Sequence, residues 1–114
     1  MARNVYSEIN LHFTWRTKES RFLIKPGTEH RVHDAIRRRA SAGDGVVVHA
    51  IGGTVNHVHL AVSVPPTIEV SKWIGRVKGG SSHDLNELPI FGGGFQWQTG
   101  YGVVSFGTKA LPWV

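Results

Sequence analysis

The chain has 114 residues, a mass of 12.6 kDa and no cysteine, and its 13 Lys and Arg against 8 Asp and Glu give a net charge of +5. This length predicts one domain over residues 1–114. The absence of cysteine excludes disulfides and Cys-ligated zinc, and no apolar run reaches the roughly 18 residues of a membrane span. We therefore expect a cytoplasmic protein with no membrane partner, whose basic surface favours nucleic acid.

The first half of the chain predicts a strand, a helix and a pair of strands. Residues 7–16 alternate between polar and apolar, which is the period of a half-buried strand. Apolar residues then recur at helical spacing from Thr28, a favourable N-cap residue, to Ala40. Residues 46–51 and 55–64 are rich in β-branched side chains and are joined by Gly52-Gly53-Thr54, which indicates a hairpin.

The second half predicts another helix and a last strand. Two prolines end the preceding strand, and Val70, Trp73, Ile74 and Val77 follow at helical spacing until Gly79-Gly80 weakens the pattern. Residues 85–94 are typical of a loop, residues 95–106 of a strand or hairpin, and residues 107–114 of the start of a further helix. The order β-α-β-β-α-β predicts an α+β, ferredoxin-like domain with an antiparallel sheet and helices on one face.

His57 and His59 lie in the strand predicted over residues 55–64. Alternate side chains of a strand share a face, so the two imidazoles lie about 7 Å apart and can converge on one divalent cation. For a bare His-x-His pair, two hydrogen-bonded histidines on a sheet are the commoner arrangement. A catalytic cation also needs a third ligand, and zinc with three or four protein ligands is the alternative metal.

Four ordered segments resemble the single-tyrosine transposases of small bacterial insertion sequences and their palindrome-associated relatives. His57-Val58-His59 is similar to the His-hydrophobic-His motif of this family. The other three segments are residues 11–18 (LHFTWRTK), residues 73–82 (WIGRVKGGSS) and residues 95–106 (FQWQTGYGVVSF), which are similar to the family's first strand, second helix and last strands. Together they cover almost the whole chain.

The resemblance implies a domain that binds single-stranded or hairpin DNA and cleaves one strand through a 5′-phosphotyrosine intermediate. It also implies that His57 and His59 hold Mg²⁺ or Mn²⁺, of which Mn²⁺ suits imidazole better. Members from insertion sequences pair as homodimers, whereas the palindrome-associated relatives tend to be monomers.

The nucleophilic tyrosine of the family lies on a helix after the last strand. In this sequence that helix would begin near Lys109, so we expect the nucleophile beyond Val114 and a chain that binds DNA without cleaving it. Tyr101 is the less favoured substitute nucleophile, because its pattern is that of a sheet residue. The alternative function is a non-catalytic DNA-binding remnant or regulator of the same fold, and a zinc-dependent hydrolase is a weaker third possibility.

Five basic residues are candidates for DNA contacts. Arg16 and Lys18 belong to the first matching segment, and Lys78 resembles a family position near the DNA. Arg37 and Arg38 lie on the basic face of the first helix. The alternative for this face is that it is only solvated and contacts no phosphate.

Overall fold

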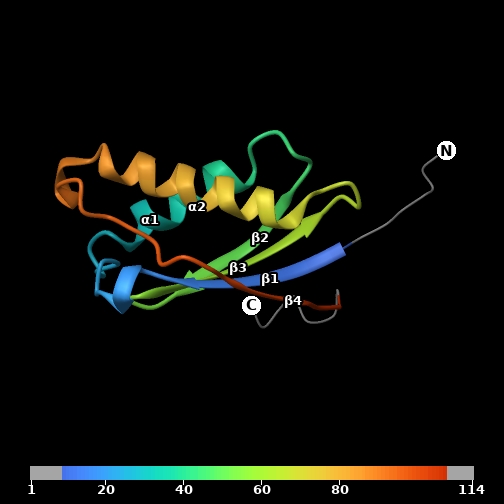
Figure 1. Cartoon of the computed structure of the whole chain (residues 1–114), viewed down its shortest axis with the longest axis horizontal. Helices are drawn as coiled ribbons and strands as arrows, with labels where there is room; N and C mark the ends of the chain where they lie inside the picture. The colour runs from blue at the N-terminus through green and yellow to red at the C-terminus, as the bar shows by residue number, and fades with distance from the viewer. Residues whose placement is uncertain (1–8, 108–114) are drawn as a thin grey trace.

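The computed structural model describes residues 9–107, which form two helices and a four-stranded sheet (Figure 1). The strands are β1 (Ile9–Arg16), β2 (Val47–Gly53), β3 (His57–Val64) and β4 (Gly102–Ser105), and the helices are α1 (Glu29–Ala40) and α2 (Val70–Asn86). Two short 3-10 helices, η1 (Lys18–Ser20) and η2 (Pro89–Phe91), lie in the connections. The predicted start of a helix at residues 107–114 lies almost wholly outside the described residues, as do the first two residues of the predicted first strand.

The sheet has the strand order β2-β3-β1-β4, with every neighbouring pair antiparallel. Both helices cover the same face of this sheet (Figure 1). No helix of residues 9–107 covers the other face, which is called the helix-free face below. The predicted α+β, ferredoxin-like class is therefore confirmed. β3, the strand of the histidine pair, is an inner strand with hydrogen-bonded neighbours on both sides.

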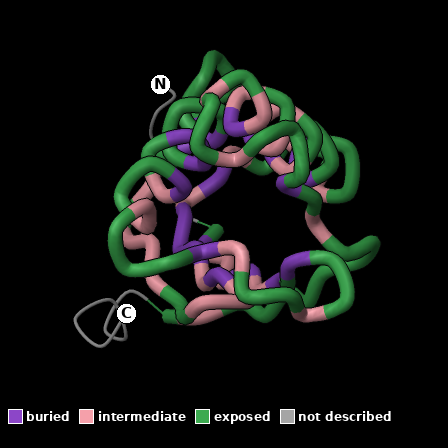
Figure 2. The backbone as a smooth tube through the Cα atoms, turned by 90° about the vertical axis from the view of Figure 1, so that its left-hand side faces the viewer, coloured by how far each residue is buried: buried purple, intermediate pink, exposed green. Residues whose placement is uncertain are grey.

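The core lies between the sheet and the two helices. Phe13 and Trp15 of β1 and alternate residues of β3, such as Leu60, are buried against the helices. In Figure 2 the buried segments of the tube lie where the helix layer and the sheet face each other. Because side chains alternate along a strand, the residues between these core positions point to the helix-free face. Within residues 9–107 neither helix has the length and apolar character needed to cross a bilayer.

The second helix is longer than the sequence predicts. Gly79 and Gly80 do not end it, and α2 continues to Asn86, the second residue of the predicted loop. Ser81 and Leu85 are buried and continue the spacing of Val77. Packing of this stripe against the core outweighs the roughly 1 kcal/mol that each glycine costs in a helix.

The prediction of a continuous strand or hairpin over residues 95–106 is wrong for its first seven residues. Only Gly102–Ser105 pairs with β1, and Trp97 forms an isolated bridge to Thr17. Gly100 has a φ of 98°, which breaks the extended backbone. The Lys78 ammonium on α2 also binds the carbonyl oxygens of Gln98 and Gly100, at 2.7 and 2.6 Å. Tertiary hydrogen bonds therefore hold this segment in an irregular path.

An ion pair joins the two helices on the outer surface. Arg39 of α1 donates two hydrogen bonds to the Asp84 carboxylate of α2, at 2.8 and 2.7 Å. These bonds lower the pKa of Asp84 below its ordinary value, so this carboxylate stays charged at neutral pH. The Arg39 side chain also lies against Gly80, where a Cβ would collide with it. A glycine in mid-helix thus leaves the space that the pair needs.

Candidate metal centre and nucleic-acid interface

The hairpin of β2 and β3 sets the position of the histidine pair. Gly53 ends β2 with a φ of 145°, and a Cβ on Gly53 would overlap the backbone of His57. The Thr54 N–H donates to the His57 carbonyl across the turn, at 3.0 Å. Only glycine leaves room for so close an approach, so this turn fixes the position of the His57 backbone.

His57 and His59 share the helix-free face of β3, as the alternation predicts. Their ring centroids lie 5.1 Å apart, and the rings are nearly perpendicular. The Nδ1 atom of His57 lies 3.2 Å from Asn56 Oδ1 and 2.8 Å from Thr54 Oγ1. Because the amide oxygen only accepts, these contacts favour the neutral tautomer with its proton on Nδ1. In that tautomer the lone pair is on Nε2, where it can bind a metal.

His12 of β1 is a third imidazole at this site, and sequence reasoning missed it. Its Nε2 atom lies 3.0 Å from His59 Nδ1, and the two ring centroids are 5.1 Å apart. Partial burial lowers the pKa of His59, and the neighbouring His12 and His57 lower it further. His59 is therefore neutral at pH 7, the form that binds metal. The hydrogen bond to His12 fixes which ring nitrogen of His59 faces outward.

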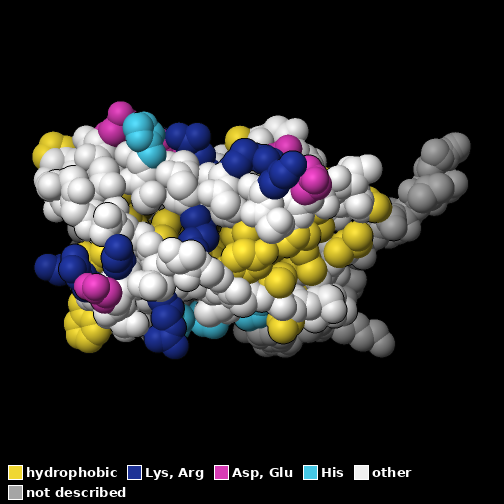
Figure 3. Space-filling model, in the orientation of Figure 1, with side chains coloured by type: hydrophobic (Ala, Val, Ile, Leu, Met, Phe, Trp, Pro, Cys, Tyr) yellow, Lys and Arg dark blue, Asp and Glu magenta, His cyan; other side chains and the backbone are white. Residues whose placement is uncertain are grey.

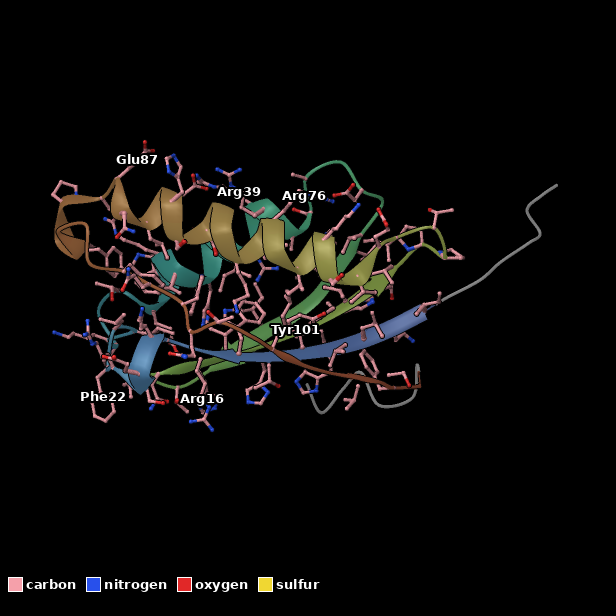
Figure 4. The ribbon with its side chains drawn as sticks, in the orientation of Figure 1. Arg16, Phe22, Arg39, Arg76, Glu87 and Tyr101 are labelled. Atoms are coloured by element: carbon pink, nitrogen blue, oxygen red, sulfur yellow. The ribbon has the colours of Figure 1, made fainter. Side chains whose placement is uncertain are left out.

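Arg16 lies beside the histidine pair on the same face. The antiparallel register places Arg16 opposite His57 and Thr14 opposite His59, so their side chains are direct neighbours across the strands. Figure 4 shows Arg16 projecting from the side of the sheet away from the helices. Figure 3 shows histidine side chains along the same lower edge of the molecule. The site therefore combines imidazoles with one guanidinium.

Two grooves border the irregular segment that precedes β4. The larger, of about 450 Å³, lies between α2 and residues 96–101 and is lined by Lys18, Lys78 and Tyr101 among others. The second, of about 340 Å³, is lined by Thr14 and Arg16 on the other side of the same segment. The structure thus brings Lys18 and Lys78 together, with Arg16 in the neighbouring groove. Burial lowers the pKa of Lys78, two of whose N–H groups bind backbone carbonyls.

The other predicted residues lie elsewhere. The Tyr101 ring packs on Phe13, at a centroid distance of 5.9 Å, on the face that the helices cover. The ring contact of Tyr101 is therefore with the core, although Tyr101 also lines the smaller groove with Thr14 and Arg16. Arg37 and Arg38 are exposed on α1, and the sheet separates this helix from the histidines (Figure 1).

A second group of potential metal ligands lies on α2. His83, Asp84 and Glu87 place one ligand atom each within 4.8 Å of one another among the described residues. The Asp84 carboxylate already binds Arg39 through both oxygens, and the three residues lie at the C-terminal end of α2, where Glu87 is the C-cap. Two imidazoles on an inner strand fit a divalent metal better than this paired carboxylate does.

Comparisons with known proteins give the family and the fold of the chain. Residues 5–114 match the family model described as IS200-like transposase. No curated protein matches the chain in sequence. Among solved structures, the chain is similar to a candidate transposase from Deinococcus radiodurans R1, with 19% identity and a TM-score of 0.80 over 99% of this chain and 90% of that one.

A second similar structure is a REP-associated tyrosine transposase bound to a REP hairpin. It is 16% identical, with a TM-score of 0.65 over 98% of this chain and 66% of that chain. At such identities the two structures demonstrate a common fold. The family match extends over nearly the whole sequence and includes the histidine pair, so the chain belongs to the IS200-like transposase family.

Proposed function

We propose that this chain binds single-stranded or hairpin DNA along the sheet face that carries His57 and His59. We further propose that this face serves cleavage and transfer of one strand. The observation that carries the proposal is the pair of oriented imidazoles beside Arg16, in a chain of a transposase family. The known complex of a similar fold with a DNA hairpin supports it.

The proposed reaction is phosphoryl transfer to a tyrosine hydroxyl. The phenol loses its proton as its oxygen bonds to phosphorus, and the 3′ oxygen takes up a proton as its bond to phosphorus breaks. The products are a 5′-phosphotyrosine link and a free 3′-OH. The helix predicted to carry the nucleophilic tyrosine begins near Lys109, which lies outside the residues that the structure describes. A divalent cation, Mg²⁺ or Mn²⁺, would be held by His57 and His59 and would stabilise charge on the scissile phosphate.

The residues of this chain hold and orient the phosphate group. Arg16 is placed to pair with a phosphate oxygen next to the histidines, because its guanidinium offers several N–H donors in one plane. Lys18 follows two residues later and faces the groove on the far side of residues 98–101. We propose that a DNA strand passes over this end of β1 and that both cations contact its phosphates, with Lys78 fixing the segment between them.

The test compares the two basic residues at the end of β1 with two basic residues of α1. In the double variant Arg16→Ala, Lys18→Ala, we expect affinity for a labelled DNA hairpin to fall about tenfold or more, with the slope of log K against log salt reduced by about one to two. Anisotropy titrations at several salt concentrations measure both. The double variant Arg37→Ala, Arg38→Ala removes the same charge from α1, and we expect a loss of about threefold at most.

Equal losses from the two double variants would contradict this interface. They would show that net charge alone drives binding, because the sheet separates Arg16 and the histidines from Arg37 and Arg38 of α1. A larger loss from the α1 variant would move the DNA to the helix side, where the sequence also predicts contacts.

We also propose that the chain forms a homodimer through the edge of β4. This edge strand exposes Val104, at 62% of its surface, whereas the opposite edge strand β2 carries a bulge between Val48 and Ala50. A regular apolar edge can extend its hydrogen bonds to a second sheet, and a bulge discourages this.

We expect light scattering to give about twice the mass of one chain, and Val104→Lys to restore the mass of one. A mass near 12.6 kDa at every concentration would contradict the dimer.

A further inference from the structure

We propose that Phe22 is a stacking platform for one unpaired base of the bound DNA, an inference that rests on the proposed function. Phe22 is the most exposed large hydrophobic side chain among the described residues, with 66% of its surface accessible. It lies outside the core and outside the groups assigned above to metal or phosphate. An aromatic ring so exposed is available to a partner with a flat apolar face.

The ring forms one edge of an apolar groove of about 270 Å³. Phe91, Phe95 and Ile90 line the same groove, which places further apolar surface beside Phe22. Ile90 is also exposed, at 56%. A nucleobase inserted here would stack on Phe22 and cover apolar surface that otherwise faces water.

The segment that presents Phe22 is held in an uncommon backbone conformation. Glu19 and Ser20 both have positive φ, at 55° and 56°, although neither is glycine. Such residues cost free energy and are retained where the surrounding contacts hold them. The Glu19 N–H donates to Gln98 Oε1 at 2.8 Å, and the Thr17 hydroxyl donates to the Arg21 carbonyl at 2.6 Å. The loop is therefore pre-organised for a partner rather than free to collapse onto the core.

The same loop is joined to the histidine site. The Thr17 N–H donates to the carbonyl of Asn56, the residue before His57, and the Ile24 N–H donates to the carbonyl of Val55, each at 2.9 Å. Figure 4 shows Phe22 and Arg16 projecting from the same end of the sheet, away from the helices. A strand whose phosphates contact Arg16 thus has its neighbouring bases within the same region of the surface.

Charge favours nucleic acid over an apolar protein segment as the occupant. Residues 16–25 contain four basic side chains and one acidic one, and the basic side chains of Arg21 and Lys25 are exposed on either side of Phe22. Glu19, the acidic member, is already paired with Arg21 at 3.0 Å. An exposed aromatic ring among cations is the arrangement that binds single strands, because the cations contact phosphates while the ring contacts a base.

The experiment combines protein variants with DNA that lacks single bases. The probe is a fluorescein-labelled hairpin with a single-stranded extension of roughly ten nucleotides at its foot, and a set of the same probe with one abasic position each. We expect Phe22→Ala to lower affinity about tenfold and Phe22→Trp to retain it. The control Val47→Ala, at a β2 residue as exposed as Ile90 but outside this groove, should change affinity less than about threefold. Because these side chains are exposed, the melting temperatures of all variants should match that of the parent chain.

The abasic set identifies stacking. At one position, removal of the base should lower the affinity of the parent chain about tenfold and leave that of Phe22→Ala unchanged, because the lost contact is the same. If the parent chain binds the hairpin and Phe22→Ala binds it equally well, the platform is wrong and the proposed function stands. The platform is also wrong if the affinity losses from Phe22→Ala and from removal of a base add at every position of the probe. They would add if Phe22 served a protein partner. If the parent chain binds no hairpin, both proposals fall.

Discussion

Replacement of His57 by alanine is expected to lower the affinity of the chain for Mn²⁺ by about 100-fold or more. One of the two imidazoles is then lost, and changes of residues that merely orient a ligand already cost 10–100-fold. His59→Ala should have the same effect, because the two rings lie 5.1 Å apart on one face of β3. Calorimetric titration of the purified chain with MnCl₂ measures the binding directly, without DNA or activity.

His83→Ala is the matched control for this titration. It removes one imidazole from the exposed group on α2 and leaves β3 intact. We expect its Mn²⁺ affinity to equal that of the parent chain. If His83→Ala loses the binding heat while His57→Ala retains it, the cation binds on α2 and the metal site proposed on the sheet is wrong.

The second large effect concerns the core. Trp73 of α2 is 1% exposed and packs on Phe13 of β1 at a ring distance of 5.4 Å, so it joins the helix layer to the sheet. We expect Trp73→Ala to cost about 3–5 kcal/mol of unfolding free energy. For a domain of this size, that cost lowers the melting temperature by more than about 12 °C, which thermal unfolding followed by circular dichroism measures.

Trp73→Phe should cost much less than the loss of ring size suggests. The indole Nε1 of Trp73 is buried and has no hydrogen-bond partner among the described residues, so its removal relieves a desolvation penalty of about 1–3 kcal/mol. Trp97→Phe is the control, because the Trp97 Nε1 donates to the Ser81 hydroxyl at 3.0 Å. That substitution removes the same atoms and breaks a hydrogen bond. An equal or larger loss from Trp73→Phe would contradict this account.

Local pattern was sufficient to predict β1, the hairpin and the common face of His57 and His59. Period-two alternation is a property of single strands, and the glycines between β2 and β3 carry their own turn signal. His12 could not be predicted as their neighbour, because that depends on the register between β1 and β3, whose contacts are 47 residues apart in sequence. His12 and Arg16 are an even number of residues apart in one strand, so they share a face. This alternation is the one signal in the sequence that could have placed His12 on the face of Arg16.

Tertiary contacts decided the elements that were predicted incorrectly. Glycine propensity favours an end to α2 at Gly79-Gly80, yet burial of Leu85 and the Arg39–Asp84 pair extend the helix. Residues 95–101 have the composition of a strand, but the side chains of Asn86 and Lys78 bind their backbone groups. Phe22 follows a turn in which Glu19 and Ser20 have positive φ, and no glycine in the local sequence indicates such a turn.

The inner position of β3 has an energetic consequence for metal binding. Both histidine-bearing positions belong to a ladder that is hydrogen-bonded on either side, so the donors are placed when the chain folds. Folding therefore carries the conformational entropy cost of bringing the two imidazoles together, and metal binding does not add to it. Small domains that fold only around zinc behave in the opposite way. This fold should be fully formed in the presence of a chelator, and added metal should raise its stability only by mass action.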